Sequence, residues 1–344
     1  MLELRDIEKP EVGDDDVLVR VHAAGVDQGV WHLMAGLPYL VRIMGFGLRA
    51  PKTPVRGSDL AGVVEAVGAN VTAFEPGHEV FGAGHGTFAE FALANASHLV
   101  RKPPSLSFEQ AAAVPTSALT ALQGVRDHGG VRAGQRVLVV GAAGGVGSFA
   151  VQIAKALGAE VTGVCSTGKV DTVRSIGADH VIDYTREDFT ASGARWDVIL
   201  DIAGNRPLSR LRRALTSTGT LVIVGGERGD RWIGGMHRSF GAVTLSPFVG
   251  QHLRMFIATV RREDLDFLAE LVEAGKLIPL VDRSFPLGQV PDAIRYLREG
   301  RARGKVVIAV DAMSNVQSRQ IPMTKGGAVP PSEISPIKPD SFTS

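Results

Sequence analysis

A glycine-dense turn between an apolar strand and a helix constrains the fold of this chain more than any other sequence feature. The turn, residues 141–147, lies within the segment RVLVVGAAGGVGSFAVQIAKALGAEVTGVCS, residues 136–166. The pattern predicts a buried strand before the turn, a helix after it that ends at Gly158, and then a second strand. The predicted buried face of this helix consists of Val146, Ala150, Ile153 and Leu157.

The same turn predicts a dinucleotide site. Glycines at this place let the backbone approach a diphosphate, and the free amides and dipole of the following helix favour its negative charge. A glycine pattern alone carries little weight, but here the strand before it and the helix and strand after it are all present. The alternative is a tight strand-to-helix turn that binds no ligand.

The end of the second strand bears on which dinucleotide binds. This strand ends at Cys165 and is followed by Ser166, Thr167, Gly168 and Lys169, where an NAD enzyme usually has an acid for the ribose hydroxyls. A hydroxyl and an ammonium can instead bind a phosphate on that ribose, which favours NADPH over NADH. Lys169 as a solvated lysine at a helix start is the alternative. Cys165 is expected to be a buried strand residue, because nothing in the sequence places a base beside it.

The chain has two parts that differ in their pattern of apolar and turn residues. Its first hundred residues read as short strands separated by turn residues, which indicates a mainly β domain. Apolar runs then alternate with helical stretches, as in a doubly wound parallel sheet. After a predicted helix at residues 263–274, the regular alternation of strands and helices ends, and a strand is predicted at residues 305–310. The chain is therefore expected to come back and complete its first domain. The predicted strands cover residues 16–22, 62–67, 79–81, 136–140, 160–165, 180–183, 198–202, 220–224 and 305–310.

Composition argues against several classes of function. With 37 Lys and Arg against 36 Asp and Glu, the formal charge is +1, so no overall field attracts nucleic acid or an anionic membrane. The single cysteine rules out an internal disulfide and zinc sites that need two thiolates, and it fits the reducing cytoplasm. No stretch predicts a membrane span or a signal peptide. Residues 312–344, with five prolines and no apolar period, are predicted to be a disordered tail.

Six motifs, in this order, resemble the medium-chain dehydrogenase/reductase superfamily, specifically its zinc-independent quinone oxidoreductase branch, which includes zeta-crystallin-like proteins. They are VRVHAAGVDQGVWHLMAG, VRGSDLAGVVEAVGANVTAFEPGHEVFG, AAAVPTSALTALQGV, VLVVGAAGGVGSFAVQIAKALGA, IGADHVIDY and ARGKVVIAV, and they span about residues 1–310. The resemblance implies an α/β fold: a Rossmann domain at residues 113–262, and a mainly β, GroES-like catalytic domain formed from both chain ends, residues 1–112 and 263–311. An active site between the two domains is implied as well.

The zinc alcohol dehydrogenases of this superfamily hold their catalytic metal with side chains from three of these motifs. The matching positions here are Asp27, Ser58 and Thr116, and one carboxylate beside two hydroxyls does not make a three-ligand zinc site. Gly77, His78 and Glu79 spell a GHE motif, but their place after Pro76 favours a surface turn. The four-cysteine structural zinc loop has no counterpart. We therefore expect no metal.

The resemblance also assigns cofactor contacts. It implies that Thr120 lies near the nicotinamide ribose and that four residues of the turn bind the diphosphate. Three residues would meet the phosphate on the adenosine ribose, and Ala203 and Gly204 would flank the adenosine half. The nicotinamide half would be lined by two strand-end glycines and by two residues near the return to the first domain, with Phe248 beside it. The four turn residues are Gly144, Gly145, Val146 and Gly147, and the three residues at the ribose phosphate are Ser166, Lys169 and Tyr184. The strand-end glycines are Gly225 and Gly226, and the residues near the return to the first domain are Gly304 and Lys305.

Without a metal, hydride transfer to an enone or quinone needs hydrogen-bond donors for the charge that grows on the carbonyl oxygen. His32 and Tyr39 are the candidate donors, and Asp27 is the candidate for orienting a water or the nicotinamide ribose. Asp27 begins the stretch Asp-Gln-Gly-Val, where the branch usually has Asn-Pro-x-Asp. Structural packing of His32 beside Trp31 and of Tyr39 against Phe46 remains the alternative. Residues 37–50 are either an apolar lid over the substrate or a buried helix.

These observations predict an NADPH-dependent oxidoreductase that transfers hydride to quinones or α,β-unsaturated carbonyls. A zinc-free alcohol or aldehyde dehydrogenase and a non-catalytic NADPH-binding protein are the alternatives. The expected partners are a small carbonyl or quinone substrate and, from the resemblance, a second copy of the chain. This homodimer would form through the outer strand of the Rossmann sheet, expected around residues 242–245.

Overall fold

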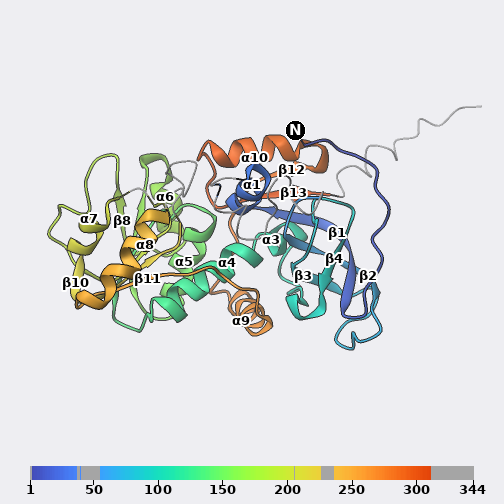
Figure 1. Cartoon of the computed structure of the whole chain (residues 1–344), viewed down its shortest axis with the longest axis horizontal. Coiled ribbons are helices and arrows are strands. Elements are labelled where there is room, and N and C mark those ends of the chain that lie inside the picture. The colour runs from blue at the N-terminus through green and yellow to red at the C-terminus, as the bar shows by residue number, and fades with distance from the viewer. Residues whose placement is uncertain (1, 37–38, 40–54, 205, 226–235, 311–344) are drawn as a thin grey trace, which may run out of the picture.

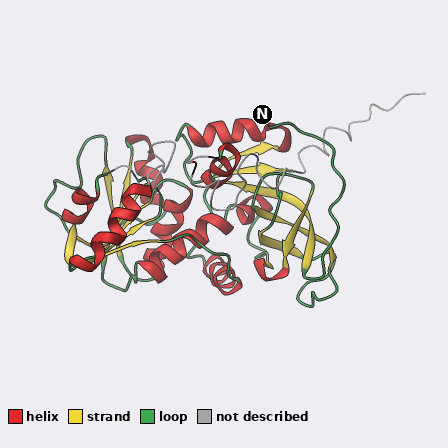
Figure 2. Cartoon of the chain, viewed as in Figure 1, coloured by secondary structure: helices red, strands yellow, loops and turns green. Residues whose placement is uncertain are grey.

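The computed structural model describes residues 2–36, 39, 55–204, 206–225 and 236–310, and these form two sheets with helices around them (Figure 1). Figure 2 shows the strands gathered into two groups, one at each end of the elongated molecule. Six consecutive strands of the middle of the chain form one group. The other group combines strands from the beginning and the end of the chain.

The mixed sheet is built from both chain ends. The early strand β1 lies between β2 and the late strand β13, and it pairs with β4 as well. Alternation along β1 places its apolar side chains inside, and all of Val17, Val19 and Val21 are at most 1% exposed. The strands of this sheet are β1 (Asp16–Val26), β2 (Asp59–Val67), β3 (Glu79–Ala83), β4 (Phe91–Asn95), β5 (Leu99–Arg101), β12 (Val281–Pro286) and β13 (Lys305–Ala309).

The second sheet is parallel, with strand order β11-β10-β9-β6-β7-β8. The order reverses between β6 and β9, and in doubly wound sheets such a switch point opens the crevice that holds a ligand. The strands are β6 (Arg136–Val140), β7 (Glu160–Cys165), β8 (His180–Asp183), β9 (Trp196–Asp201), β10 (Leu215–Ile223) and β11 (His252–Met255). Buried runs in β6 and β9 match the two covered faces of a parallel sheet.

Helices cover both sheets and fill the space between them. The α-helices are α1 (Gln28–Ala35), α3 (Phe108–Ala112), α4 (Pro115–Leu122), α5 (Gly145–Ala156), α6 (Val170–Ser175), α7 (Leu208–Arg213), α8 (Met236–Leu245), α9 (Arg262–Glu273) and α10 (Val290–Arg298). One apolar core contains Ala23 and Phe81 of the mixed sheet together with Val139 and Leu200 of the parallel sheet. The two sheets are therefore joined by a continuous packed interface around α4 and α5.

The observed architecture confirms the predicted fold class. A Rossmann-type parallel sheet lies beside a mainly β domain that both chain ends complete. Three predicted strands, at residues 136–140, 160–165 and 180–183, match the observed bounds of β6, β7 and β8. Within the described part of the chain, no helix has the length and apolar character needed to cross a bilayer. The predicted tail, residues 312–344, lies outside the described residues.

Candidate functional site

The glycine turn after β6 is tightly packed at Gly147 and open at Gly144. A Cβ at Gly147 would lie 2.1 Å from the carbonyl oxygen of Gly141, so this glycine is required by the fold of the turn itself. A Cβ at Gly144 would meet only that same oxygen, at 3.4 Å. Gly144 is also the N-cap of α5 and has no side chain to accept the first amides of the helix. These amides suit an anion, because they lie at the positive end of the helix dipole.

The turn contacts the chain segment that returns to the mixed sheet. Gly304 N donates to the carbonyl oxygen of Ala143 at 2.9 Å, and Gly144 and Gly304 pair as in a parallel ladder. Gly304 has φ of +102°, which a residue with a side chain rarely adopts. The structure therefore brings Gly304 to the glycine turn, and its expected place along the nicotinamide half stays a prediction.

A buried charged cluster lies beside this contact. Lys305 Nζ donates to Ser117 Oγ at 3.0 Å and lies 3.4 Å from Asp59 Oδ2. Lys305 is 2% exposed and Asp59 is fully buried. The other carboxylate oxygen of Asp59 accepts from the Thr116 hydroxyl at 2.5 Å and from the Thr116 amide at 3.1 Å. We call Asp59, Thr116, Ser117 and Lys305 the buried cluster.

The buried cluster touches the start of α5. A Cβ at Gly145 would lie 3.1 Å from Lys305 Cδ and 3.3 Å from Ser117 Oγ. The side chains of Lys305 and Ser117 therefore pack against the first turn of the helix that is expected to hold a diphosphate. Thr120, one turn further along α4 than Thr116, donates its hydroxyl to the Thr116 carbonyl at 2.7 Å.

Burial raises the pKa of the Asp59 carboxyl to about 6, although the Lys305 ammonium acts in the opposite direction. The nearby carboxylate of Asp27 raises the pKa of Asp59 further. Asp27 is the N-cap of α1, where its Oδ1 accepts from Val30 N at 3.1 Å. Its Oδ2 is buried, with no hydrogen-bond partner in the described part of the chain. The structure thus places Asp27, the predicted substrate-side acid, near the buried cluster.

The two candidate donors lie in or after the same short helix. His32 is in α1, and its ring meets that of Trp31 edge-on, with 5.1 Å between the ring centroids. Tyr39 is described, but most of the predicted lid around it, residues 37–50, falls outside the described residues. The donor roles of His32 and Tyr39 stay predictions.

The adenosine end differs in part from expectation. Tyr184 N donates to the Cys165 carbonyl at 3.0 Å, so Tyr184 follows β8 directly beside the end of β7 and Ser166. The Lys169 ammonium, however, donates to the carbonyl oxygens of Gly300 at 2.8 Å and Ala302 at 2.6 Å. The Lys169 ammonium is half-buried, and this partial loss of hydration lowers its pKa. The two carbonyl oxygens accept the hydrogen bonds that water would otherwise accept.

An acid, Asp183, also stands one strand away from Lys169. Asp183 ends β8 and accepts from the Thr167 hydroxyl at 2.6 Å and from the Thr185 hydroxyl at 2.7 Å. These hydrogen bonds, led by that of Thr167, lower the pKa of Asp183 and keep it ionised. The contact of Lys169 with a ribose phosphate stays a prediction.

Ala203 and Gly204 follow the end of β9 and Gly225 follows the end of β10, on the other side of β6 from β7, while Gly226 lies outside the described residues. The expected contact of Ala203 and Gly204 with the adenosine half stays a prediction. The proposed place of Phe248 beside the nicotinamide is wrong. Phe248 is 83% exposed in a short 3₁₀ helix, Ser246–Phe248, between the end of α8 and the start of β11. That short helix lies beside the start of β11, at the edge of the sheet opposite the carboxyl ends of the strands. This is because α8 runs back along the sheet from the end of β10 to the start of β11.

The predicted outer strand is also misplaced. Residues 242–245 belong to α8, and the outer strand is β11, which follows that helix. Apolar residues such as Ala242 recur with helical spacing and pack onto the sheet face, which explains why the short segment reads as a strand. The homodimer itself stays a prediction.

The GHE sequence forms a surface turn, as predicted. Gly77 has φ of +93°, and Glu79 begins β3. Both ring nitrogens of His78 have partners at this turn, Glu75 N at 2.9 Å and Arg101 Nη2 at 2.7 Å. Among the described residues no three His, Cys, Asp or Glu side chains converge as metal ligands.

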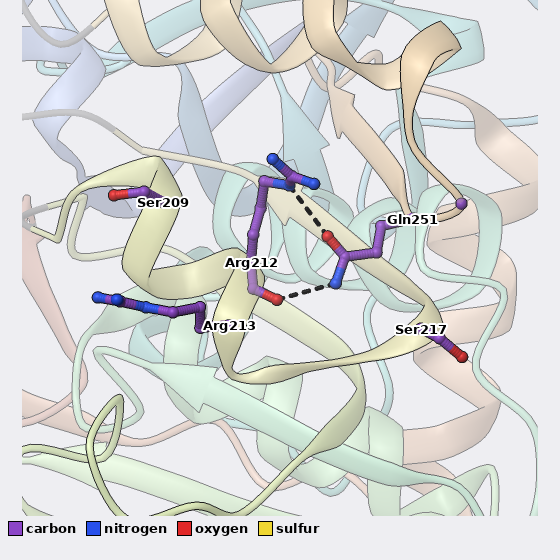
Figure 3. A pocket seen from close by; sticks show the side chains of 6 residues that line it. Ser209, Arg212, Arg213, Ser217 and Gln251 are labelled. Carbon is purple, nitrogen blue, oxygen red and sulfur yellow. Dashed lines mark hydrogen bonds between the residues drawn. The ribbon is translucent and has the colours of Figure 1, made fainter.

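A polar pocket of about 400 Å³ opens elsewhere on the parallel-sheet domain (Figure 3). In Figure 3 the Gln251 amide both accepts from Arg212 Nε and donates to the Arg212 carbonyl, at 3.0 and 2.8 Å. The pocket lies near the starts of β10 and β11, whereas the glycine turn follows the end of β6. In a parallel sheet these are opposite edges, so the pocket is separate from the candidate site. Its lining residues are Ser209, Arg212, Arg213, Ser217, Gly250 and Gln251.

Several residues of these sites carry little or no signal in the sequence. Asp59 lay unassigned within a quoted motif, and its signal was an acid at the start of an otherwise apolar strand. Ser117 gave no signal of its own. Asp201 ends the apolar strand β9, and Arg238, its buried partner, lies on α8.

Comparison with known proteins agrees with this architecture. Residues 13–104 match the profile of the alcohol dehydrogenase GroES-like domain, and residues 176–308 match that of the zinc-binding dehydrogenases. The mitochondrial NAD(P)H oxidoreductase RTN4IP1 of Bos taurus is 35% identical over 329 residues, covering 86% of this chain and 82% of the relative. The 2-methylene-furan-3-one reductase of Solanum lycopersicum is 33% identical, covering 87% and 73%.

A solved structure extends the likeness to three dimensions. The quinone oxidoreductase from Coxiella burnetii superimposes with a TM-score of 0.76 at 27% identity, covering 90% of this chain and 94% of the other. Sequence motifs, sheet order and relatives therefore agree. The chain belongs to the medium-chain dehydrogenase/reductase superfamily of nicotinamide-dependent oxidoreductases, with quinone and enone reductases among its relatives.

Proposed function

We propose that this protein is an NADPH-dependent reductase that transfers hydride to quinones or α,β-unsaturated carbonyls without a metal. The observation that carries the proposal is the position of Lys305 and Ser117 against Gly145, at the positive end of α5. A buried ammonium beside free helix amides suits the diphosphate of a dinucleotide. The names of the relatives, NAD(P)H oxidoreductase and 2-methylene-furan-3-one reductase, support the reaction class.

The bound nicotinamide would supply the hydride, and the chain would supply position and charge. The turn amides and Lys305 would hold the diphosphate. Asp59 fixes Lys305 in place through its second carboxylate oxygen, while the Thr116 hydroxyl and amide hold the first. Asp27 has a buried carboxylate oxygen with which to orient a water or the nicotinamide ribose. His32 and Tyr39 are the proposed donors to the substrate oxygen.

A zinc-free reaction fits the donor set at the positions that match the zinc ligands of the superfamily. Thr116 donates its hydroxyl to Asp59, and Asp27 caps α1. Neither arrangement supplies the nitrogen or thiolate ligands that catalytic zinc sites combine. Cytoplasmic localisation stays a prediction, since similar proteins include mitochondrial and chloroplastic ones.

The test is a steady-state assay of purified protein with NADPH and a panel of quinones and enones, before and after dialysis against EDTA. We expect NADPH oxidation that depends on the electrophile and survives dialysis. Absence of turnover with every electrophile, combined with tight NADPH binding, would instead indicate a non-catalytic binding protein. Activity that returns only with added zinc would contradict the metal-free reaction.

Replacement of Lys169 by glutamine tests the choice of cofactor. Because Lys169 would meet the ribose phosphate, we expect kcat/KM for NADPH to fall about tenfold, the effect of losing about 1.4 kcal/mol. The value for NADH, which lacks this phosphate, should stay within about twofold. Lys155→Gln, on the outer surface of the same domain, is the control. A parallel fall with both cofactors would show that Lys169 acts only through its bonds to Gly300 and Ala302.

A further inference from the structure

A buried arginine of the parallel-sheet domain has donors that the fold leaves unused. Arg238 lies in the first turn of α8, and its side chain is 8% exposed. Its Nη2 donates to Oδ2 of the fully buried Asp201, at the end of β9. Its Nε and Nη1 are buried, and neither has a hydrogen-bond partner within the described ranges.

Unused donors on a buried guanidinium are costly. Nearly all buried polar groups in native proteins have a partner, and an ionised donor without one loses its hydration and gains nothing in return. Asp201 accepts a hydrogen bond from only one of the three guanidinium nitrogens of Arg238, Nη2. The other carboxylate oxygen of Asp201 accepts from Gly204 N at 3.2 Å. The arrangement therefore lacks an acceptor oxygen that faces Nε and Nη1.

The location of Arg238 indicates where this acceptor comes from. Asp201 organises the two strand ends beside it: its carboxylate accepts from Gly204 N, and its carbonyl accepts from Gly225 N at 3.3 Å. The diphosphate turn follows β6, the next strand of the sheet, and Lys169 follows β7 on the far side of that turn. A dinucleotide whose adenosine half lies over β7 extends its other half over β9 and β10.

We propose that Arg238 binds an oxygen of the nicotinamide half of the cofactor, either the carboxamide oxygen or a hydroxyl of the adjoining ribose. This inference rests on the proposed function and adds to it a recognition residue outside the glycine turn. The planar fork of arginine allows Nη2 to keep Asp201 while Nε and Nη1 face a second acceptor. The same side chain then fixes both the strand ends and the ring that must be aimed.

The experiment compares binding of three ligands by titration calorimetry to the wild type and to Arg238→Lys. Adenosine 2′,5′-bisphosphate lacks the nicotinamide half, 2′-phospho-ADP-ribose lacks only the nicotinamide ring, and NADP⁺ has both. Lysine keeps a charge beside Asp201 but loses the fork, so we expect Kd for NADP⁺ to rise about tenfold. Kd for adenosine 2′,5′-bisphosphate should stay unchanged. A tenfold rise with 2′-phospho-ADP-ribose as well identifies the ribose as the partner, and no rise identifies the carboxamide.

Two results would overturn the inference. One is an equal loss of affinity for all three ligands, which would mean that Arg238 only supports the fold. The other is no loss for any of them, which would mean that water satisfies the unused donors. Failure of the wild type to bind any of the three would be distinct from both, and it would remove the proposed function together with this inference.

Two further variants separate binding from folding. Arg213→Lys changes an exposed arginine on α7 of the same domain and should leave all three affinities unchanged. The double variant Asp201→Asn/Arg238→Gln replaces the buried ion pair with a neutral pair, which protects the fold if lysine at residue 238 does not. We expect it to retain affinity for adenosine 2′,5′-bisphosphate within about twofold and to lose NADP⁺ affinity about tenfold.

Discussion

Replacement of Gly144 by valine is expected to leave the protein folded and to weaken NADPH binding at least about 100-fold, or about 3 kcal/mol. Gly144 has φ of −84° and ψ of 177°, an extended conformation that valine adopts readily. A Cβ there meets only the Gly141 carbonyl oxygen, at 3.4 Å, so the protein itself has room for this atom. The diphosphate would need that same room. Fluorescence titration with NADPH and urea unfolding measure the two effects.

Two other glycines frame this prediction. Gly288→Val, in the other domain, also enters open space and should change neither NADPH affinity nor stability by more than about 1 kcal/mol. Gly147→Val is expected to yield unfolded protein, because its Cβ would lie 2.1 Å from the Gly141 carbonyl oxygen. If Gly144→Val binds NADPH as tightly as the wild type does, the diphosphate does not lie on this turn.

Much of the fold could be predicted because its signals are local. The bounds of β6 and β7 follow from apolar runs that end at a glycine turn and at Cys165. The helix between them has Ala150 and Ile153 buried at the predicted spacing. The return of the late chain to the first domain was predicted from the change in sequence pattern after residue 262, and β13 does pair with β1. In each case neighbouring residues carry the whole pattern.

The buried cluster could not be predicted in the same way. Asp59 and Lys305 are 246 residues apart in the chain, and neither strand carries a sign of the other. The pairing depends on how the two sheets pack and on which rotamers bring the charged atoms together. Lys169 shows the same limit, since its ammonium binds carbonyls of a loop more than a hundred residues away. Sequence spacing identifies the strand end on which a side chain stands, and tertiary packing decides what it touches.

Removal of the Lys305 charge is expected to lower the free energy of unfolding by about 3 to 5 kcal/mol. Lys305→Met would leave the fully buried Asp59 without its cation, and loss of one member of a buried ion pair typically costs about 3 to 5 kcal/mol. Urea unfolding at pH 8 measures the loss. Lys155→Met, which removes a half-exposed pair with Asp179, should cost less than about 1 kcal/mol. Asp59→Asn/Lys305→Met should recover most of the stability, because no buried charge remains.

The pH dependence distinguishes this loss from a simple packing defect. The pKa of Asp59 is raised by folding from 3.8 to about 6, so the folded state binds the extra proton and stability falls as pH rises through that window. Lys305→Met lacks the ammonium that opposes this shift, so the pKa of Asp59 rises further. The free energy of unfolding of the variant therefore keeps falling to a higher pH than that of the wild type. The stability difference between wild type and Lys305→Met should therefore be small at pH 5 and widen towards pH 8. An equal difference at both pH values would mean that Lys305 stabilises the interior through its methylene chain, because only a charge effect depends on the protonation of Asp59.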